Sequence, residues 1–342
     1  MKLFIKRLLS FSIFLIILFV ALLFLYIKLD PFKVIKSYDS YYDTNANGWV
    51  ALNRDFVSTT TFIKNSETID YDSFIFGNSR SIFYQVDDWK KYLEPDAKCY
   101  HFDASNESLW AISKKIEFID KCGVNLDNVL LVLDYPTIIQ DKQREGHLST
   151  ISPPLVDNSN LFDFHKKFYF AFLNPKFLYA YIDFKVSGEV RPHIKKMAIL
   201  NDIPYHYDIT TNEIRYEIFE NLIETEEDKY YTPARLSLFY DRDTLTQQYS
   251  RPAILKGQKK LFNNIQSILE KHNSKVKVII SPLYDQMKLN ESDLIYLKDT
   301  FGEDNVFDFS GINEFTNNYK NYYENSHYRP HLARKLLEIA YE

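Results

Sequence analysis

The chain has 342 residues and a formal net charge of −5, with 46 Asp and Glu against 41 Lys and Arg. This length corresponds to one large domain or two modest ones. A hydrophobic content of 46% permits a packed core, and the lack of a basic excess argues against a nucleic-acid-binding protein. Two cysteines exclude a disulfide scaffold and a cysteine-rich zinc module. Only 8 Gly, against 26 Tyr and 27 Phe, argue against glycine-rich phosphate loops and disordered linkers.

The first strong feature is an uncharged apolar run at residues 8–27, which reads LLSFSIFLIILFVALLFLYI. About 20 helical residues match a hydrocarbon core of about 30 Å. No small-residue cleavage site follows, so we predict an uncleaved transmembrane anchor rather than a cleaved signal peptide. Residues 1–7 then form a cytoplasmic tail, and the rest of the chain lies outside the cytoplasmic membrane, although the flanking basic residues are tied in number.

Beyond a polar, Tyr-rich connector at 28–69, strand patterns alternate with helical patterns. Strands are predicted at 73–76, 99–102, 128–133, 276–280 and 305–309, and helices at 108–121, 258–271 and 330–341. Continuous apolar strands that alternate with helices indicate a parallel sheet buried on both faces. We therefore expect a three-layer, flavodoxin-like α/β domain over residues 70–342.

Residues 140–254 interrupt this alternation and are aromatic and charged, so we interpret them as an insertion that forms a cap or side lobe. Within it, residues 168–184 resemble a membrane segment, but Asn174-Pro175-Lys176 splits them into two runs too short to span. A core or interfacial helix is the expected structure there.

Candidate catalytic residues follow the predicted strands, where ligands bind in open α/β sheets. Ser79 lies in Gly-Asn-Ser-Arg-Ser after the first strand, and Glu324 and His327 precede the last helix. In a catalytic arrangement, His327 would take the proton of the Ser79 hydroxyl and Glu324 would orient the imidazole. The structural alternatives are a turn or N-cap serine and a surface or capping histidine.

These residues carry a family resemblance. A strand followed by Gly-Asn-Ser-Arg-Ser resembles the first block of the SGNH (GDSL-like) hydrolase superfamily, and Glu324-Asn-Ser-His327 resembles its terminal Asp-x-x-His block. One membrane anchor joined to such a domain resembles bacterial proteins that help to acylate cell-surface polysaccharides. The resemblance implies a cofactor-independent serine esterase or O-acyltransferase acting on acyl, foremost acetyl, esters of a surface carbohydrate, with a membrane-bound acyltransferase as a partner.

The sequence departs from the family pattern at three places. Glu324 replaces the usual Asp, Asn106 stands near the usual second-block Gly, and Asp134 follows the third strand where an Asn oxyanion donor is usual. Arg80 is interpreted either as a ligand for a substrate carboxylate or as an ion-pair partner of Asp134. These departures keep open a second function, a non-catalytic binding or assembly partner of a membrane acyltransferase or of a polysaccharide export system.

Further residues have weaker assignments. Cys99 begins the second strand and Cys122 ends the next helix, so both a disulfide and two separate thiols are open. The aromatic insertion, with Trp89 and Trp110, is expected to shape a carbohydrate groove or to pack in the core. His327 and His331 have a helical metal-ligand spacing, but Arg329-Pro330 indicates a helix start, so no metal site is predicted.

Overall fold

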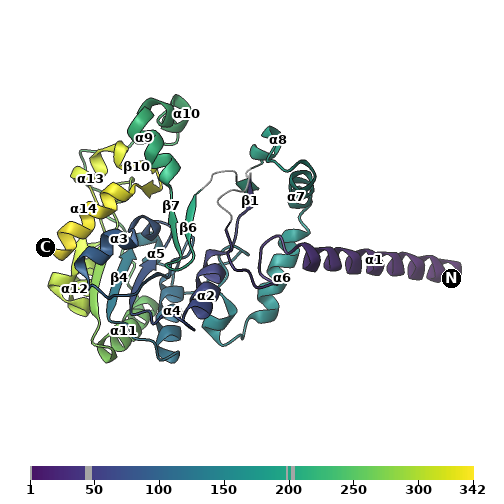
Figure 1. The fold of residues 1–342 in the computed structure, drawn as a ribbon, viewed down its shortest axis with the longest axis horizontal. Coiled ribbons are helices and arrows are strands. Elements are labelled where there is room, and N and C mark those ends of the chain that lie inside the picture. Colours follow the sequence, from purple (N-terminus) through teal and green to yellow (C-terminus); the bar gives the residue numbers. More distant parts are fainter. Residues whose placement is uncertain (1, 43–47, 198, 202–204) are drawn as a thin grey trace. The chain divides into compact units, whose positions relative to one another are not determined.

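The structure is a computed structural model that describes residues 2–42, 48–197, 199–201 and 205–342. The chain divides into two compact units (Figure 1). The first comprises residues 1–52 and 160–204, and the second comprises residues 53–159 and 205–342. The first unit contains the apolar N-terminal segment, and the second contains the predicted sheet.

The first unit is built on one long helix, α1 (Lys2–Leu29), whose apolar side chains cover all its sides. Its stretch Leu3–Leu29 is long and apolar enough to cross a membrane. The Asn174 side chain caps the helix that Pro175 begins, so the chain breaks between two helices where the sequence predicted. The other elements of this unit are α6 (Leu161–Phe172), α7 (Pro175–Ser187), α8 (Pro192–Lys195) and the antiparallel pair of β1 (Trp49–Val50) with β5 (Leu200–Asn201).

The second unit contains a five-stranded parallel sheet with the strand order β3-β2-β4-β8-β9. Numbered along the chain, this order is 2-1-3-4-5. The predicted strands all coincide with these elements, although their ends are slightly shifted. The strands are β2 (Ser73–Gly77), β3 (Cys99–His101), β4 (Asn128–Leu133), β8 (Lys275–Ile280) and β9 (Val306–Asp308).

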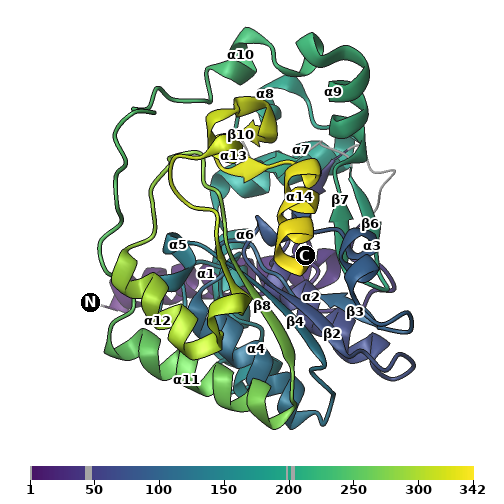
Figure 2. The same ribbon diagram turned by 90° about the vertical axis from the view of Figure 1, so that its left-hand side faces the viewer.

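Helices cover both faces of this sheet (Figure 2). Side chains alternate between the faces along each strand, so Phe74 and Phe76 face one layer while Ile75 faces the other. The first layer consists of α2 (Arg54–Asn65), α4 (Leu109–Lys121), α11 (Lys256–Lys271) and α12 (Glu291–Phe301). The second includes α3 (Val86–Trp89) and α14 (Pro330–Tyr341). The second unit is thus a mixed α/β structure with a helix-flanked parallel sheet.

Shorter elements surround the sheet. The β6-β7 hairpin is held against the edge strand β3, because the His101 N–H donates to the Thr211 carbonyl over 2.8 Å. The remaining elements are α5 (Tyr135–Ile138), β6 (His206–Asp208), β7 (Glu213–Arg215), α9 (Glu217–Tyr230), α10 (Pro233–Leu236), α13 (Glu314–Asn317), β10 (Tyr322–Glu324) and β11 (His327–Tyr328).

The structure assigns two segments of the chain differently from our sequence-based prediction. The segment 28–69, expected to be a connector, contains helix α2, whose Phe62 is buried in the core of the second unit. The run Thr59-Thr60-Thr61 obscured this helix, because β-branched residues have low helix propensity. Residues 160–204 of the expected insertion belong to the first unit, and residues 140–159 and 205–254 belong to the second.

The two cysteines are free thiols in the structure. Cys99 is buried on the sheet face that α14 covers, whereas α4, which ends just before Cys122, packs on the opposite face. Cys122 is exposed at the end of that helix. The disulfide interpretation is therefore wrong for this structure, because the strand directs the Cys99 side chain away from the layer that carries Cys122.

Candidate active site

The turn after β2 presents Ser79 at the carboxyl edge of the sheet, and Asn78 fixes this turn. The buried Asn78 amide donates to Asp134 Oδ2 over 2.6 Å and to Thr137 Oγ1 over 2.9 Å. Its side-chain oxygen accepts the Arg80 N–H over 2.9 Å. Ser79 itself is half-buried. No role was predicted for Asn78, and its position beside a candidate nucleophile was the only signal in the sequence.

Gly77 makes this turn sterically feasible. A Cβ atom at this position would lie 2.7 Å from the Ser81 Cβ and 2.7 Å from the Val132 carbonyl oxygen. Both distances are far below van der Waals contact, so only glycine allows the turn to pack so closely against β4. This tight packing fixes the position of the Ser79 hydroxyl at the end of β2.

Ser79, His327 and Glu324 form one hydrogen-bonded chain. The Ser79 Oγ lies 2.9 Å from His327 Nε2, and His327 Nδ1 contacts Glu324 Oε1. Glu324 ends β10 and His327 begins β11, so a tight antiparallel hairpin brings the two side chains together. A carboxylate that accepts the Nδ1 proton leaves Nε2 as the acceptor for a serine hydroxyl. The structure thus brings together the three residues that the sequence singled out.

Glu324 is held in its ionised form. Burial alone would raise the pKa of this carboxyl, but its hydrogen bond and charge interaction with His327 outweigh burial and lower it. The Ser326 N–H contributes by donating to Glu324 Oε2 over 2.7 Å. One carboxylate oxygen therefore contacts the imidazole and the other is fixed by the backbone. The extra methylene of Glu compared with Asp is accommodated in this geometry.

Arg80 joins the nucleophile turn to the histidine loop. Its Nε donates to the Ser326 carbonyl over 2.8 Å, and its Nη1 lies 2.7 Å from Asp134 Oδ2. The guanidinium therefore contacts the loop between Glu324 and His327 while it pairs with a buried carboxylate. Of the two interpretations of Arg80, the structure shows the ion pair with Asp134.

Asp134 is buried, with a relative exposure of 2%, and every contact it makes is structural. It accepts the Thr137 N–H over 2.9 Å and so caps α5. Its other oxygen accepts from Asn78 and Arg80. This carboxylate is compensated by a guanidinium and an amide, which reduces the repulsion that a bare charge would exert on a nearby oxyanion.

Two backbone positions near the site, at Ser79 and at Asn106, are candidates for stabilising an oxyanion. The Ser79 N–H donates to no acceptor in the described part of the chain. Asn106, predicted to stand near the family's glycine, has φ +56° and is exposed in the loop after β3. A positive φ is the conformation that favours Gly and that Asn tolerates. No hydrogen bond joins Asn106 to Ser79 or His327 among the described residues.

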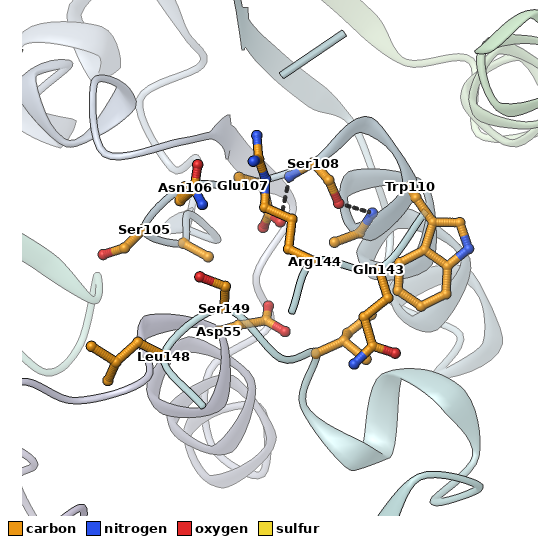
Figure 3. A pocket seen from close by; sticks show the side chains of 13 residues that line it. Asp55, Ser105, Asn106, Glu107, Ser108, Trp110, Gln143, Arg144, Leu148 and Ser149 are labelled. Atoms are coloured by element: carbon orange, nitrogen blue, oxygen red, sulfur yellow. Dashed lines mark hydrogen bonds between the residues drawn. The ribbon is translucent and has the colours of Figure 1, made fainter. Parts of the chain in front are cut away.

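Two hollows flank this edge of the sheet. The first lies at the ends of β4 and β8 and is lined in part by Asp134, Ser281 and Asp285. Burial raises the pKa of Asp285. The second lies beside the loop after β3, where Figure 3 shows Asn106, Trp110 and Arg144 around it. Burial lowers the pKa of the Arg144 guanidinium, and its Nε has no hydrogen-bond partner among the described residues.

Several aromatic residues pack in the core of the second unit. Phe83 lies edge-on to the His327 ring, with centroids 5.9 Å apart, and also contacts Tyr216 and Tyr323. Trp89 is fully buried and donates to the Tyr341 hydroxyl over 2.7 Å. These rings form core around the histidine hairpin, whereas Trp110 borders the hollow of Figure 3.

His331 does not join His327 at a common site. Its Nε2 lies 3.0 Å from Asn321 Oδ1, and burial lowers its pKa to about 4. No group of three or more His, Cys, Asp or Glu side chains is placed to hold a metal ion in the described ranges.

The chain matches no protein-family model, no curated protein and no solved structure. The site must therefore be interpreted from its own geometry.

Proposed function

We propose that this chain is a membrane-anchored serine esterase or O-acyltransferase of the SGNH type. It would act on acyl, foremost acetyl, esters of a cell-surface carbohydrate. The observation that carries the proposal is the chain of contacts from Ser79 Oγ through the His327 imidazole to the Glu324 carboxylate. A serine, an imidazole and a carboxylate in this order are the groups that acyl transfer requires.

The reaction follows from these contacts. The Ser79 Oγ attacks the ester carbonyl carbon while its proton passes to His327 Nε2. Collapse of the tetrahedral intermediate breaks the bond to the carbohydrate oxygen, which receives that proton from His327. Water or a carbohydrate hydroxyl then attacks the acyl-Ser79 ester and gives its proton to His327. The bond from the acyl carbon to Ser79 Oγ breaks, Ser79 Oγ takes the proton back from His327, and the acid or the transferred ester is released. Glu324 stabilises the imidazolium at both stages.

The oxyanion requires donors near Ser79. The Ser79 N–H, which has no acceptor among the described residues, supports one donor, and the exposed loop around Asn106, whose φ is +56°, supports a second. Arg80 would act as a positioning residue that keeps the Ser326 carbonyl, and with it the histidine hairpin, against the nucleophile turn.

The strand order 2-1-3-4-5 supports a flavodoxin-like fold for the sheet, with the candidate site at the carboxyl ends of its strands. The apolar helix α1 supports a single-pass anchor. We place the chain in a bacterial cytoplasmic membrane, with residues 1–7 in the cytoplasm and the C-terminal region in the periplasm or outside the cell.

One observation favours a second function, that of a non-catalytic partner of a membrane acyltransferase or polysaccharide export system. The side-chain amide of the preceding residue, Asn78, already donates to Asp134 and Thr137. A site with too few free oxyanion donors would bind an ester without cleaving it.

The purified full chain, assayed with p-nitrophenyl acetate and with an acetylated polysaccharide, tests the proposal. Ser79→Ala and His327→Ala should each abolish turnover. His331→Ala is the matched control, because this histidine is four residues away and contacts Asn321 instead of the candidate site. Turnover that survives both substitutions would refute this catalytic site, and a wild-type chain without turnover on any acyl ester would favour the binding partner.

A further inference from the structure

Helices α6 and α7 of the first unit expose a set of large apolar side chains. On α7, Tyr179, Ile182 and Val186 are 53%, 51% and 80% exposed, and their spacing of three and four residues places them on one helix face. On α6, Phe162 and Phe170 are 83% and 59% exposed. An apolar face of this extent usually marks a surface that is covered in the functional state.

The opposite faces of both helices already supply the core of this unit. Phe168 and Phe177 are buried, and each packs against the ring of Phe32, with centroids 5.4 and 4.8 Å apart. Helix α7 is therefore apolar on two sides, although packing within its unit uses only one. The exposed side needs an apolar environment from elsewhere.

Contacts of α6 with the apolar helix α1 indicate that this apolar environment is the membrane. The Tyr169 hydroxyl on α6 donates to the Phe19 carbonyl over 3.3 Å, and its ring lies edge-on to the Phe19 ring at 5.4 Å. Tyr26 packs against Tyr169 and Phe172. Phe19 precedes the end of α1 at Leu29 by ten residues, or about 15 Å of helix. Figure 1 shows α6 beside this end of α1 and running across it.

The charge of the first unit also favours contact with a membrane surface. Without the tail at residues 1–7, which lies at the other end of α1, this unit (residues 8–52 and 160–204) contains 10 Lys and Arg against 7 Asp and Glu, although the whole chain has a net charge of −5. Lys166, Lys176, Lys185 and Lys195 are exposed on or beside α6, α7 and α8. Apolar side chains next to basic ones are typical of helices that lie in the surface of an anionic membrane.

We propose that α6 and α7 lie in the interface of the membrane that α1 spans, with Phe170, Ile182 and Val186 in the acyl region and the lysines at the headgroups. This inference rests on the proposed anchor, because α1 sets the depth of Tyr169. It does not depend on the esterase chemistry. The first unit would then contact the membrane through two helices in addition to the anchor.

Fluorescence quenching of the full-length chain in vesicles of phosphatidylethanolamine and phosphatidylglycerol tests this inference. Single cysteines carrying an environment-sensitive dye replace Ile182 or Val186 in a Cys99→Ser, Cys122→Ser background. Leu245→Cys is the matched control, since Leu245 is an apolar residue of the second unit that is 92% exposed. Phe14→Cys reports on the anchor itself. Lipids with a nitroxide on the acyl chain quench dyes in the bilayer, and iodide quenches dyes in water.

The nitroxide lipids should quench the dyes at 182, 186 and 14 severalfold more than the dye at 245, and iodide should show the reverse order. Quenching at 14 without quenching at 182 and 186 would overturn the inference and leave the anchor intact. Protection of 182 and 186 from both quenchers would also overturn it, because a protein partner would then cover this face. A dye at 14 that only iodide quenches would overturn the anchor and the inference together, and the esterase assay would remain a separate test.

Discussion

Replacement of Glu324 by Gln tests the candidate triad most selectively, because the two side chains have the same shape. In the structure, one Glu324 oxygen contacts His327 Nδ1 and the other accepts the Ser326 N–H over 2.7 Å. A Gln side chain that keeps the Ser326 hydrogen bond must use its carbonyl oxygen there. Its NH2 group then faces His327 Nδ1 and donates to it, so the ring proton moves to Nε2.

The expected loss of activity in Glu324→Gln follows from this change of tautomer. With a proton on Nε2, the imidazole 2.9 Å from Ser79 Oγ donates a hydrogen bond to the hydroxyl and no longer accepts its proton. A wrong tautomer at such a triad costs about 10⁴-fold in kcat, or about 5.5 kcal/mol of transition-state stabilisation. We expect Glu324→Gln to lower kcat by about 10³ to 10⁴-fold, with KM nearly unchanged.

The assay is the hydrolysis of p-nitrophenyl acetate by the purified chain, with thermal unfolding as a check on folding. Glu324→Asp is the control, since it keeps the charge and moves the carboxylate back by one methylene. It should lose about 10 to 10²-fold, because its ionised oxygen still orders the Nδ1 proton at a longer distance. A Glu324→Gln chain that is folded and retains wild-type kcat would refute the assignment of Glu324 to a triad.

Three further predictions concern residues around the site. Arg80→Lys cannot contact both the Ser326 carbonyl and Asp134, so the free energy of unfolding should fall by about 2 kcal/mol and kcat should fall with little change in KM, as measured by denaturant unfolding and steady-state kinetics. Gly77→Ala places a methyl group 2.7 Å from Ser81 and from the Val132 carbonyl, so unfolding should show a loss of about 1–3 kcal/mol. Burial raises the pKa of Glu107 to about 7, so the folded chain favours its protonated form, and the stability this gives is present below the ordinary value of 4.5 and lost as the pH rises through 7. The stability of the wild type should therefore fall relative to that of Glu107→Gln as the pH rises through 7, and an equal pH dependence of the two unfolding midpoints would contradict the raised pKa.

The sequence predicted the sheet well because its strands are short, continuous apolar runs. Residues 128–133 are apolar on both faces and bounded by polar residues, and this pattern has few alternatives. The rule that ligands bind beyond strand ends then placed Ser79 at an accessible turn. The motif Glu324-x-x-His327 identified the remaining pair, since a two-residue hairpin connection brings its ends together.

Other features depend on contacts that no local pattern reveals. Asn78 orders the nucleophile turn through Asp134, which is 56 residues away in the chain. The ion pair of Arg80 with Asp134 could be named as an alternative, but its bond to the Ser326 carbonyl requires the hairpin to fold back over 246 residues. Likewise, the apolar pattern of residues 168–184 predicted a core or interfacial helix, but it did not reveal that Tyr169 and Phe172 pack on the N-terminal helix.

The central claim is that Ser79 is a nucleophile activated by His327. The most direct measurement is labelling of the purified full chain with a fluorophosphonate probe, followed by peptide mass spectrometry. We expect a single adduct on Ser79 that is lost in Ser79→Ala, forms much more slowly in His327→Ala and is kept in His331→Ala. A folded wild-type chain without an adduct on Ser79, or with equal labelling in His327→Ala, would contradict it.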